Sequence, residues 1–425
     1  MILLSVLLHT RALAAFPKSL ADNVLVLIIG GIAAFLLAYI FTFGVIAVCK
    51  KVGWLDKPGG RHIHKKSVPR LGGVAMFLGF VVVSLFFYRF DPELDAKEST
   101  IYWLFLAAAV LIVLVHVYDD ILRAYDKEVK WLPKFIVQTL AVIILLGPWG
   151  DRFNGVLLFG FNNPLNGSEI TLFIHDTRFF NGQGIIWAVI PAVFFTWFWM
   201  AGMMNAVNWI DGVDGLATGV VGLAGLFIAI ISWILGQHTI ALLSAIFTGA
   251  VFGFLPHNWN PAKIFMGDSG AQFLGLGLAV LSIMGGAKVA LVLMVVGIPI
   301  LDTALVIINR VRQGKSPTSA DNTHLYNRFL TTGLNAKQIC YILYGLTLLF
   351  GVLALNPSHS FKLVGLALVG LTMAAIIFWL DYRRRNRIRT DGGDGPLPET
   401  PAPAGNENVV EDNHGALKRG SNQPV

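Results

Sequence analysis

Charged residues are scarce in this chain, at 13% of its 425 residues. Soluble globular proteins carry about 25% charged residues, so this shortage argues against a soluble fold. Cysteine is also scarce: Cys49 and Cys340 stand far apart, which excludes a disulfide framework. Hydrophobic residues make up 55% of the chain, and the mean hydropathy is +0.67. The composition therefore predicts an all-α polytopic membrane protein.

Basic residues outnumber acidic ones, which gives a net charge of +7 and a pI of 9.4. In a soluble protein this balance can indicate nucleic-acid binding. In a membrane chain, basic residues instead orient the spans and meet anionic lipid or phosphate. We therefore expect phosphate-bearing partners and no nucleic acid.

Eleven apolar runs approach or exceed the length of about 20 residues that a membrane-spanning helix needs. The predicted spans are 22–49, 73–89, 101–118, 132–147, 185–204, 216–235, 239–255, 271–284, 288–309, 338–355 and 361–380. We expect residues 1–21 to form a lead-in, residues 22–380 the transmembrane domain and residues 381–425 a cytoplasmic tail. Gly, Pro, Asn and Glu dominate from Asp391 onward, so the tail is expected to be disordered.

Lys and Arg collect in alternate connections between these spans. They are concentrated in 50–70, 123–134, 310–328 and 383–389, whereas the connection 91–98 is acidic. By the positive-inside rule the basic connections are cytoplasmic. The N-terminus is then outside and the C-terminus inside.

Five aspartates stand beside apolar runs on the predicted cytoplasmic side. They are Asp119, Asp120, Asp211, Asp214 and Asp268. The basic loop RHIHKKSVPRLGG and the segment SADNTHLYNRFL fall on the same side. Loops far apart in sequence are therefore expected to converge on one cytoplasmic cleft.

Such a cleft has a restricted chemistry. Clustered carboxylates repel one another unless a cation neutralises them. Oxygen ligands suit Mg²⁺, which takes one or two carboxylates together with substrate phosphates. Neighbouring Lys and Arg side chains hold further phosphate charge, and glycines let backbone N–H groups approach an anion. We expect phosphoryl transfer between a water-soluble phosphate ester and a lipid phosphate.

Each feature also has a simpler interpretation. Asp119 and Asp120 can end a helix at the interface, and the stretch DGVDG can be a turn that caps the next span. The basic loop can be a topology signal, and His324 a surface histidine. Asp302 follows Pro299 inside a span, where an acid is functional by default, but we assign it no role. The joint placement of these features on one side favours the functional interpretation.

The motifs resemble those of the polyprenyl-phosphate N-acetylhexosamine-1-phosphate transferases, the family of WecA, TagO and MraY. Five motifs occur in the family's order, over about residues 50 to 380. They are KPGGRHIHKKSVPRLGG, the pair Asp119-Asp120 with Lys134 and Gln138 downstream, NAVNWIDGVDGLATG, NPAKIFMGDSGAQFLG, and the loop around His324. The number and orientation of the spans also resemble the WecA branch.

The resemblance implies a reaction in the bacterial cytoplasmic membrane, with the active site on the cytoplasmic face. Polyprenyl phosphate, undecaprenyl phosphate in bacteria, attacks the β-phosphate of a UDP-N-acetylhexosamine, and UMP leaves. The resemblance implies Mg²⁺, with Mn²⁺ as a substitute, at Asp268. It implies that Asp119 and Asp120 handle the lipid phosphate and that Lys65 binds phosphate.

On the nucleotide side, the resemblance implies that Asn208, Asp211 and Asp214 hold the nucleotide and the reacting diphosphate. Asn258 matches a nucleoside contact of the family. These assignments give Asp119, Asp120 and Asp211 catalytic roles, because they lie at the reacting groups.

The fifth loop departs from the family pattern. The WecA branch has a histidine, one spacer and two more histidines, whereas this chain reads His324-Leu325-Tyr326-Asn327-Arg328. His324 is kept as a substrate-binding residue, and Arg328 is expected to clamp the diphosphate. The loop also lacks the run of three histidines typical of MraY, which disfavours the muramoyl-pentapeptide substrate.

Three alternatives stay open. Within the family, the alternative is the MraY-type reaction on the muramoyl-pentapeptide substrate. Outside it, an ion-coupled transporter would place acids near the midplane and in repeated halves. The third alternative is an alcohol phosphatidyltransferase. Those enzymes carry an arginine in their DG motif, and its absence from DGVDGLATG argues against this class. The sequence does not identify the hexosamine, the prenyl chain length or the pathway, and a homodimer is an expectation from the family.

Overall fold

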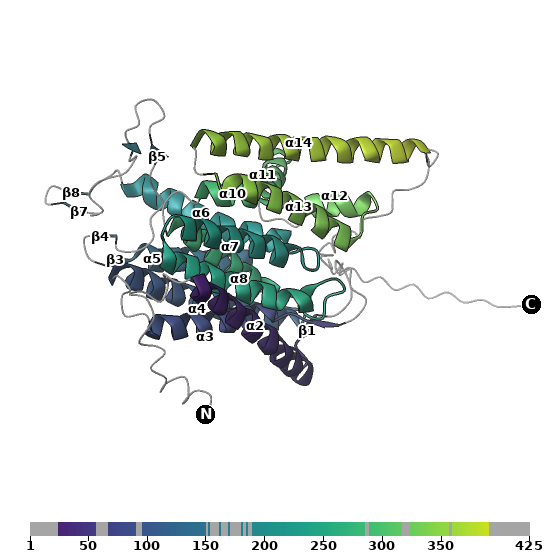
Figure 1. The fold of residues 1–425 in the computed structure, drawn as a ribbon. Helices are drawn as coiled ribbons and strands as arrows, with labels where there is room; N and C mark the ends of the chain where they lie inside the picture. The colour runs from purple at the N-terminus through teal and green to yellow at the C-terminus, as the bar shows by residue number, and fades with distance from the viewer. Residues whose placement is uncertain are drawn as a thin grey trace, which may run out of the picture.

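The computed structural model describes residues 24–56, 67–90, 96–149, 152–153, 161–162, 169–170, 180–181, 184–185, 189–284, 289–316, 324–356 and 359–390. Helices dominate these residues (Figure 1). They are α2 (Val24–Val52), α3 (Gly72–Phe90), α4 (Ala96–Arg123), α5 (Trp131–Leu146), α6 (Val189–Ile210), α7 (Leu216–Ile234), α8 (His238–Asn258), α9 (Gly267–Ile283), α10 (Val289–Val295), α11 (Gly297–Arg312), α12 (Leu325–Thr331), α13 (Ala336–Ala354) and α14 (His359–Thr390). The predicted all-α class is confirmed for the described part of the chain.

A helix overlaps each of the eleven predicted spans, and the span 288–309 is divided between α10 and α11. Among the described residues, seven helices are long and apolar enough to cross a membrane, or up to eight spans if the bent pair counts as one. The chain is therefore a multi-pass membrane protein. Eleven crossings and the orientation of the two termini stay predictions.

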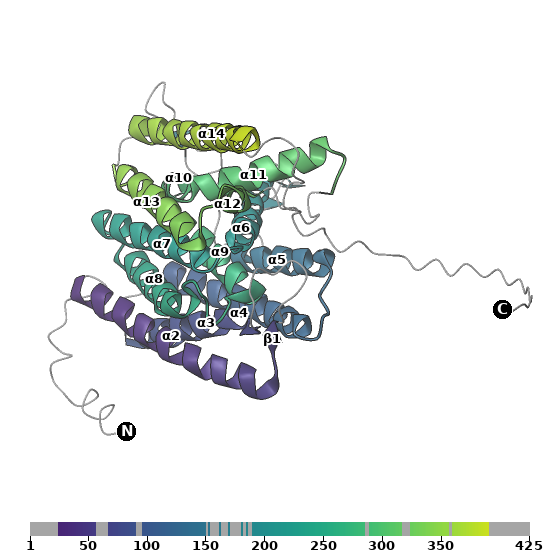
Figure 2. The same cartoon turned by 90° about the vertical axis from the view of Figure 1, so that its right-hand side faces the viewer.

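Short strands form antiparallel pairs at the two ends of the helix bundle. The pairs are β1 (Leu55–Asp56) with β2 (Val68–Pro69), β3 (Pro148–Trp149) with β4 (Arg152–Phe153), β5 (Phe161–Asn162) with β6 (Glu169–Ile170), and β7 (Phe180–Asn181) with β8 (Gly184–Ile185). In Figure 1, β3, β4, β5, β7 and β8 lie at the left end of the bundle, while β1 and α12 lie at the right end. Figure 2 looks onto the end that holds β1 and α12.

The central helix of the bundle is α9. All 17 of its residues are buried, and α3, α4 and α6 pack around it. A helix that is apolar around its whole circumference belongs in the interior, and the small residues of GDSGAQFLGLGLA let its neighbours approach closely. Its N-terminus carries Asp268, so the packing of α9 fixes the position of that carboxylate.

Helices α2 and α8 cross at two glycines. An added Cβ on Gly249 would overlap the carbonyl oxygen of Gly31, and one on Gly253 would overlap that of Phe35. Residues four apart share one helix face, and small residues in this spacing allow close backbone approach in membranes. The GAVFG stretch of α8 is therefore a helix-packing motif.

The pair α10 and α11 forms a broken span, bent by 80°. Pro299 lies in the first turn of α11, where a missing N–H costs nothing, and its ring would clash with a continuous helix from α10. The bend leaves Asp302 buried in α11, with 6% of its surface exposed.

Helix α14 is longer than predicted. It continues to Thr390, ten residues beyond the predicted span, because charged residues end an apolar run without ending a helix.

We predict that Gly249→Ala lowers the melting temperature of the purified protein in detergent. The added methyl meets a backbone oxygen that no rotamer change can move, and such overpacking costs about 1–3 kcal/mol. Gly345→Ala in α13 is the matched control, because no heavy atom lies within 4 Å of its added Cβ. This control gains about 1 kcal/mol of helix propensity. Equal melting temperatures for the two variants would contradict the packing assignment.

Candidate active site

Backbone hydrogen bonds attach the end of the first basic loop to the segment before α9. The N–H of Phe265 donates to the carbonyl of Pro69 at 2.8 Å, and Gly72 N–H donates back to Phe265 at 3.0 Å. Gly73 N–H donates to Met266 at 2.8 Å. This pairing holds Arg70, which lies between the paired residues, beside the N-terminus of α9.

Asp120 caps the N-terminus of α9 from the last turns of α4. Its Oδ1 accepts the N–H of Asp268 at 2.8 Å, and its Oδ2 accepts the N–H of Ser269 at 2.9 Å. Arg70 Nε lies 3.4 Å from the same carboxylate. The first N–H groups of a helix lack intrahelical partners, and the helix dipole favours an anion there. Both carboxylate oxygens of Asp120 are therefore engaged by hydrogen bonds to the start of α9.

Gly267 makes this cap possible. It has a φ of +71°, and an added Cβ would overlap both the carboxylate of Asp120 and the carbonyl of Arg70. Glycine adopts positive φ without the Cβ clash that other residues suffer. The GDSG motif, which sequence alone allows as an ordinary turn, thus has a specific task at the start of α9.

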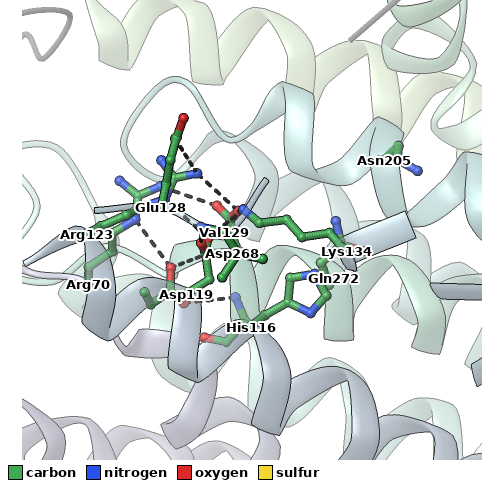
Figure 3. A network of polar contacts seen from close by, with 12 residues as sticks. Arg70, His116, Asp119, Arg123, Glu128, Val129, Lys134, Asn205, Asp268 and Gln272 are labelled. Atoms are coloured by element: carbon green, nitrogen blue, oxygen red, sulfur yellow. Dashed lines mark hydrogen bonds and ion pairs between the residues drawn. The ribbon is translucent and has the colours of Figure 1, made fainter. Parts of the chain in front are cut away.

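Three cations surround the carboxylate of Asp268. Arg70 lies 3.4 Å from its Oδ1, while Arg123 and Lys134 lie 3.4 and 2.8 Å from its Oδ2. Figure 3 shows Asp268 and Asp119 between the two arginines and Lys134. Burial alone would raise the pKa of Asp268, but Arg123, Arg70 and Lys134 hold it well below its ordinary value. The three cations therefore stabilise Asp268 in its charged form.

Asp119 joins the same network from α4, one residue before Asp120. It is fully buried, and it accepts hydrogen bonds from Lys134 Nζ, from Arg123 Nε at 3.3 Å and from the N–H of Val129 at 2.6 Å. Lys134 thus bridges Asp119 and Asp268 (Figure 3). The acidic pair does not simply end a helix, because each of its members makes buried contacts to distant segments.

Amide side chains form a polar layer next to this network. Gln138 of α5 donates to Gln272 of α9 at 2.9 Å, and Asn205 of α6 donates to Gln138 at 3.1 Å. Gln138 and Gln272 are buried, and the two bonds connect three helices. The layer ties α5, which carries Lys134, to the central helix, so it positions the lysine.

The turn between α6 and α7 is held against the loop before α9. Asp214 Oδ2 accepts from Asn260 Nδ2 at 2.9 Å and from the N–H of Ala262 at 3.0 Å. Asn258 Oδ1 accepts from Gly215 N–H at 3.1 Å and from Thr218 at 2.7 Å, and its amide donates to the carbonyl of Ile264 at 3.1 Å. Asn258 is 1% exposed, so these three hydrogen bonds brace the protein; contact with a nucleoside stays a prediction.

Asp211 differs from the other site carboxylates. It is half-buried at the start of the turn, and it makes no hydrogen bond or ion pair with any residue that the structure describes. Burial raises its pKa well above the ordinary value; Arg70 offsets part of this rise, and the negative charges of Asp268 and Asp214 add to it. Among the described residues, Asp211 therefore has no direct ion-pair partner, and Arg70 compensates its charge only in part. Asn208 lies one turn earlier, partly exposed in α6.

The fifth loop packs on the other side of this turn. His324 Nδ1 lies 3.1 Å from Asp302 Oδ2, and the His324 ring lies 6.1 Å from Trp209. The Tyr326 ring lies where a Cβ of Gly212 would be. Arg328 is partly buried in α12. The structure thus brings the fifth loop against the third motif, NAVNWIDGVDGLATG. Lys65 and its basic segment 57–66 lie outside the described residues.

The residues present fit Mg²⁺ only together with a substrate. Among the described residues, no group of three or more His, Cys, Asp or Glu side chains is placed to hold a metal. Mg²⁺ needs one or two carboxylates when phosphate oxygens complete its shell. The negative charge of Asp268 acts on Asp211, and Asp211 makes no direct ion pair with any described residue. This donor set suits a cation that arrives with a diphosphate.

Sequence reasoning missed three members of the site. Arg70 and Arg123 were counted as topology signals, and Asp56 was not considered, yet Arg70 pairs with Asp56 at 2.9 Å. Arg123 had a local signal, because it stands four residues after Asp119 on one helix and can reach it. Arg70 and Asp268 are 198 residues apart, so no local pattern could pair them.

We predict that Gly267→Ala destabilises the protein more than Gly236→Ala does. Both glycines have a φ of +71°, so both variants incur the strain of about 1–2 kcal/mol for left-handed backbone. At Gly236 nothing lies within 4 Å of the new Cβ, whereas at Gly267 it displaces Asp120. Thermal unfolding in detergent measures the difference. Equal losses would mean that the cap of α9 contributes little.

Comparison with known proteins agrees with this geometry. The model of the family described as Glycosyl transferase family 4 matches residues 102–286. A probable undecaprenyl-phosphate N-acetylglucosaminyl 1-phosphate transferase of Bacillus subtilis is 29% identical over 344 residues, covering 79% of this chain and 86% of that protein. A decaprenyl-phosphate N-acetylglucosaminephosphotransferase of Mycobacterium tuberculosis is 29% identical, covering 78% and 81%.

A phospho-N-acetylmuramoyl-pentapeptide-transferase of Clostridium novyi is also similar. It is 30% identical over 323 residues, and the alignment covers 74% of this chain and 91% of that protein. The matches include the segments that carry Asp119, Asp120, Asp211 and Asp268. The chain therefore belongs to glycosyl transferase family 4, the membrane-enzyme family whose motifs its sequence resembles.

Proposed function

We propose that this protein transfers N-acetylhexosamine 1-phosphate from a UDP-sugar, UDP-N-acetylglucosamine in the first instance, to polyprenyl phosphate. UMP is released, and the lipid-linked sugar begins a cell-envelope glycan. The names of the relatives in Bacillus subtilis and Mycobacterium tuberculosis support this reaction. Undecaprenyl phosphate is the expected acceptor.

The observation that carries the proposal is the gathering of Asp119, Asp120 and Asp268 with three cations at one end of the bundle. An active site that transfers a sugar phosphate between two phosphorylated substrates must hold several negative charges in a small volume. Arg123 and Lys134 keep 29% and 17% of their side chains exposed, so their N–H groups can reach phosphate oxygens. Fixed charges of this kind need no reorganisation during the reaction.

Mg²⁺ would be held by Asp268, with Asp211 as the neighbouring carboxylate that makes no direct ion pair with a described residue. When bound, it would neutralise charge on the diphosphate and on the leaving UMP. Mn²⁺ has similar ligand preferences and is expected to substitute. Lys65 is proposed to bind phosphate from the basic segment.

The protein's own residues mainly position the reactants. A phosphate monoester is already anionic at neutral pH, so the lipid phosphate needs orientation rather than a strong base. A covalent route through an aspartate would need a free carboxylate oxygen. Asp119, Asp120 and Asp268 have both oxygens engaged by cations or backbone N–H groups, so these three are poorly placed to act as nucleophiles, and we propose direct attack by the lipid phosphate. Either Asp119 or Asp120 is proposed to accept any residual proton.

The proposal includes a place in the cell. The site lies at the cytoplasmic face of a bacterial cytoplasmic membrane, because the basic connections lie on that side by the positive-inside rule. The N-terminus is then outside and the C-terminus inside. A homodimer is part of the same proposal and rests on the family resemblance alone.

The substrate assignment predicts a specific pattern of UMP release. Purified protein with undecaprenyl phosphate and Mg²⁺ should release UMP from UDP-N-acetylglucosamine. It should not do so from UDP-N-acetylmuramoyl-pentapeptide. Omitting the lipid should abolish release. Turnover of the muramoyl substrate alone would assign the protein to the other activity found among its relatives, and no release with any UDP-sugar would reject the proposal.

The metal assignment predicts that Asp268→Asn abolishes Mg²⁺-dependent UMP release, because the amide lacks the negative charge that would hold the cation. EDTA should stop the wild-type reaction, and added Mg²⁺ should restore it, with Mn²⁺ as a substitute. Asp381→Asn, at an exposed position in α14, is the control for a charge change elsewhere and should keep full turnover. Full turnover by Asp268→Asn would overturn the assignment.

A further inference from the structure

A buried acid inside the broken span is not explained by the transfer site described above. Asp302 of α11 is 6% exposed, and both of its oxygens are engaged. Oδ1 accepts the N–H of Leu325 at 2.9 Å, and Oδ2 lies 3.1 Å from Nδ1 of His324. Within the described part of the chain, His324 is the side chain that contacts this carboxylate. A buried acid is costly unless such contacts compensate it.

The contact fixes the proton on the histidine ring. A carboxylate in its ionised form only accepts hydrogen bonds, so an ionised Asp302 at 3.1 Å requires the proton on Nδ1 of His324. Nε2 is then the ring nitrogen left for another partner, and no described residue bonds to it. The same carboxylate holds the first N–H of α12, so His324 and its helix are fixed together. Carboxylates orient histidines in this way in many catalytic and metal sites.

His324 in turn contacts the turn that carries Asp211. Its ring stacks parallel to Tyr326 with centroids 5.8 Å apart, and it lies 6.1 Å from Trp209. Tyr326 packs on the backbone of Gly212, next to Asp211. Arg310, two turns after Asp302 on α11, lies 5.5 Å above the Trp209 ring. Contacts therefore run from α11 through His324 to residues 209–212.

The bend between α10 and α11 sets up this arrangement. Pro299 and the break before Gly297 direct α11 away from α10 by 80°. Asp302, one turn after the break, faces the start of α12 and not lipid, as its burial and its two bonds show. The fifth loop of this chain keeps one histidine where the family pattern has three. His324 is therefore the histidine of this loop that Asp302 can orient.

We propose that Asp302 is a positioning residue for sugar-nucleotide binding. It acts through His324, whose Nε2 it presents beside the turn that carries Asp211, and it does not touch substrate. This inference rests on the proposed function, because it names a residue that tunes the same site. A residue of this kind affects the affinity for the UDP-sugar and leaves the lipid phosphate side unchanged.

A double-mutant cycle tests the inference. UMP release is measured with UDP-N-acetylglucosamine and undecaprenyl phosphate for the wild type, Asp302→Ala, His324→Ala and the double variant. Each single change should raise KM for the UDP-sugar about 10- to 100-fold, the effect typical of losing an outer-shell partner. KM for the lipid should not change. Because Asp302 acts through His324, the double variant should lose no more than the worse single variant.

Thr303→Val is the matched control. Thr303 is the next residue in α11 and is buried, and its hydroxyl has no hydrogen-bond partner among the described residues. Removing the hydroxyl should therefore change neither KM nor kcat. Asp302→Asn serves if the alanine variant does not fold. It keeps an acceptor for Leu325 N–H and loses the charge that faces His324, so KM for the UDP-sugar should still rise.

Three results would overturn the inference: additive losses in the double variant, a fall in kcat with both KM values unchanged, or an unchanged KM for Asp302→Asn. A wild-type protein that releases no UMP from any UDP-sugar would instead reject the proposed function. The two failures are therefore distinguishable, because the wild-type assay is independent of the variants.

Discussion

The structure depends on one buried carboxylate, that of Asp120 at the N-terminus of α9. The central helix starts inside the bundle, where water cannot satisfy its first N–H groups. Asp120 accepts two of them at 2.8 and 2.9 Å, and the partial positive charge of the helix end stabilises the anion. Arg70 adds a cation from the first loop. This junction fixes α4, α9 and the first loop relative to one another.

The position of Asp268 follows from that junction. It is the residue whose N–H Asp120 binds, so its carboxylate lies within 3.4 Å of Arg70, Arg123 and Lys134. Cations that hold an acid in the free protein can turn to phosphate oxygens when substrate enters, because two of them keep exposed side-chain surface. Asp211 stands beside them without a partner among the described residues. This arrangement is consistent with the proposed binding of a nucleotide diphosphate together with a cation.

The sequence predicted the helical class and the ranges of the helices well, because apolar runs of span length are a direct consequence of membrane burial. It also predicted that the acids collect together, since charge placed Asp119, Asp120, Asp211 and Asp268 on one side. It could not predict their partners. Arg70 and Asp268 meet across 198 residues, and the family pattern does not show that Asn258 braces a turn through three internal bonds. The 80° bend and the continuation of α14 to Thr390 were also hidden, because hydropathy measures neither helix direction nor helix length beyond the apolar run.

An experimental structure with UDP-N-acetylglucosamine and Mg²⁺, in a lipid nanodisc without polyprenyl phosphate, tests the central claim most directly. The account predicts diphosphate density at the N-terminal end of α9, between Asp268 and Asp211, with the sugar toward His324. Density at the opposite end of the bundle, beside the strands β3 to β8, would contradict it.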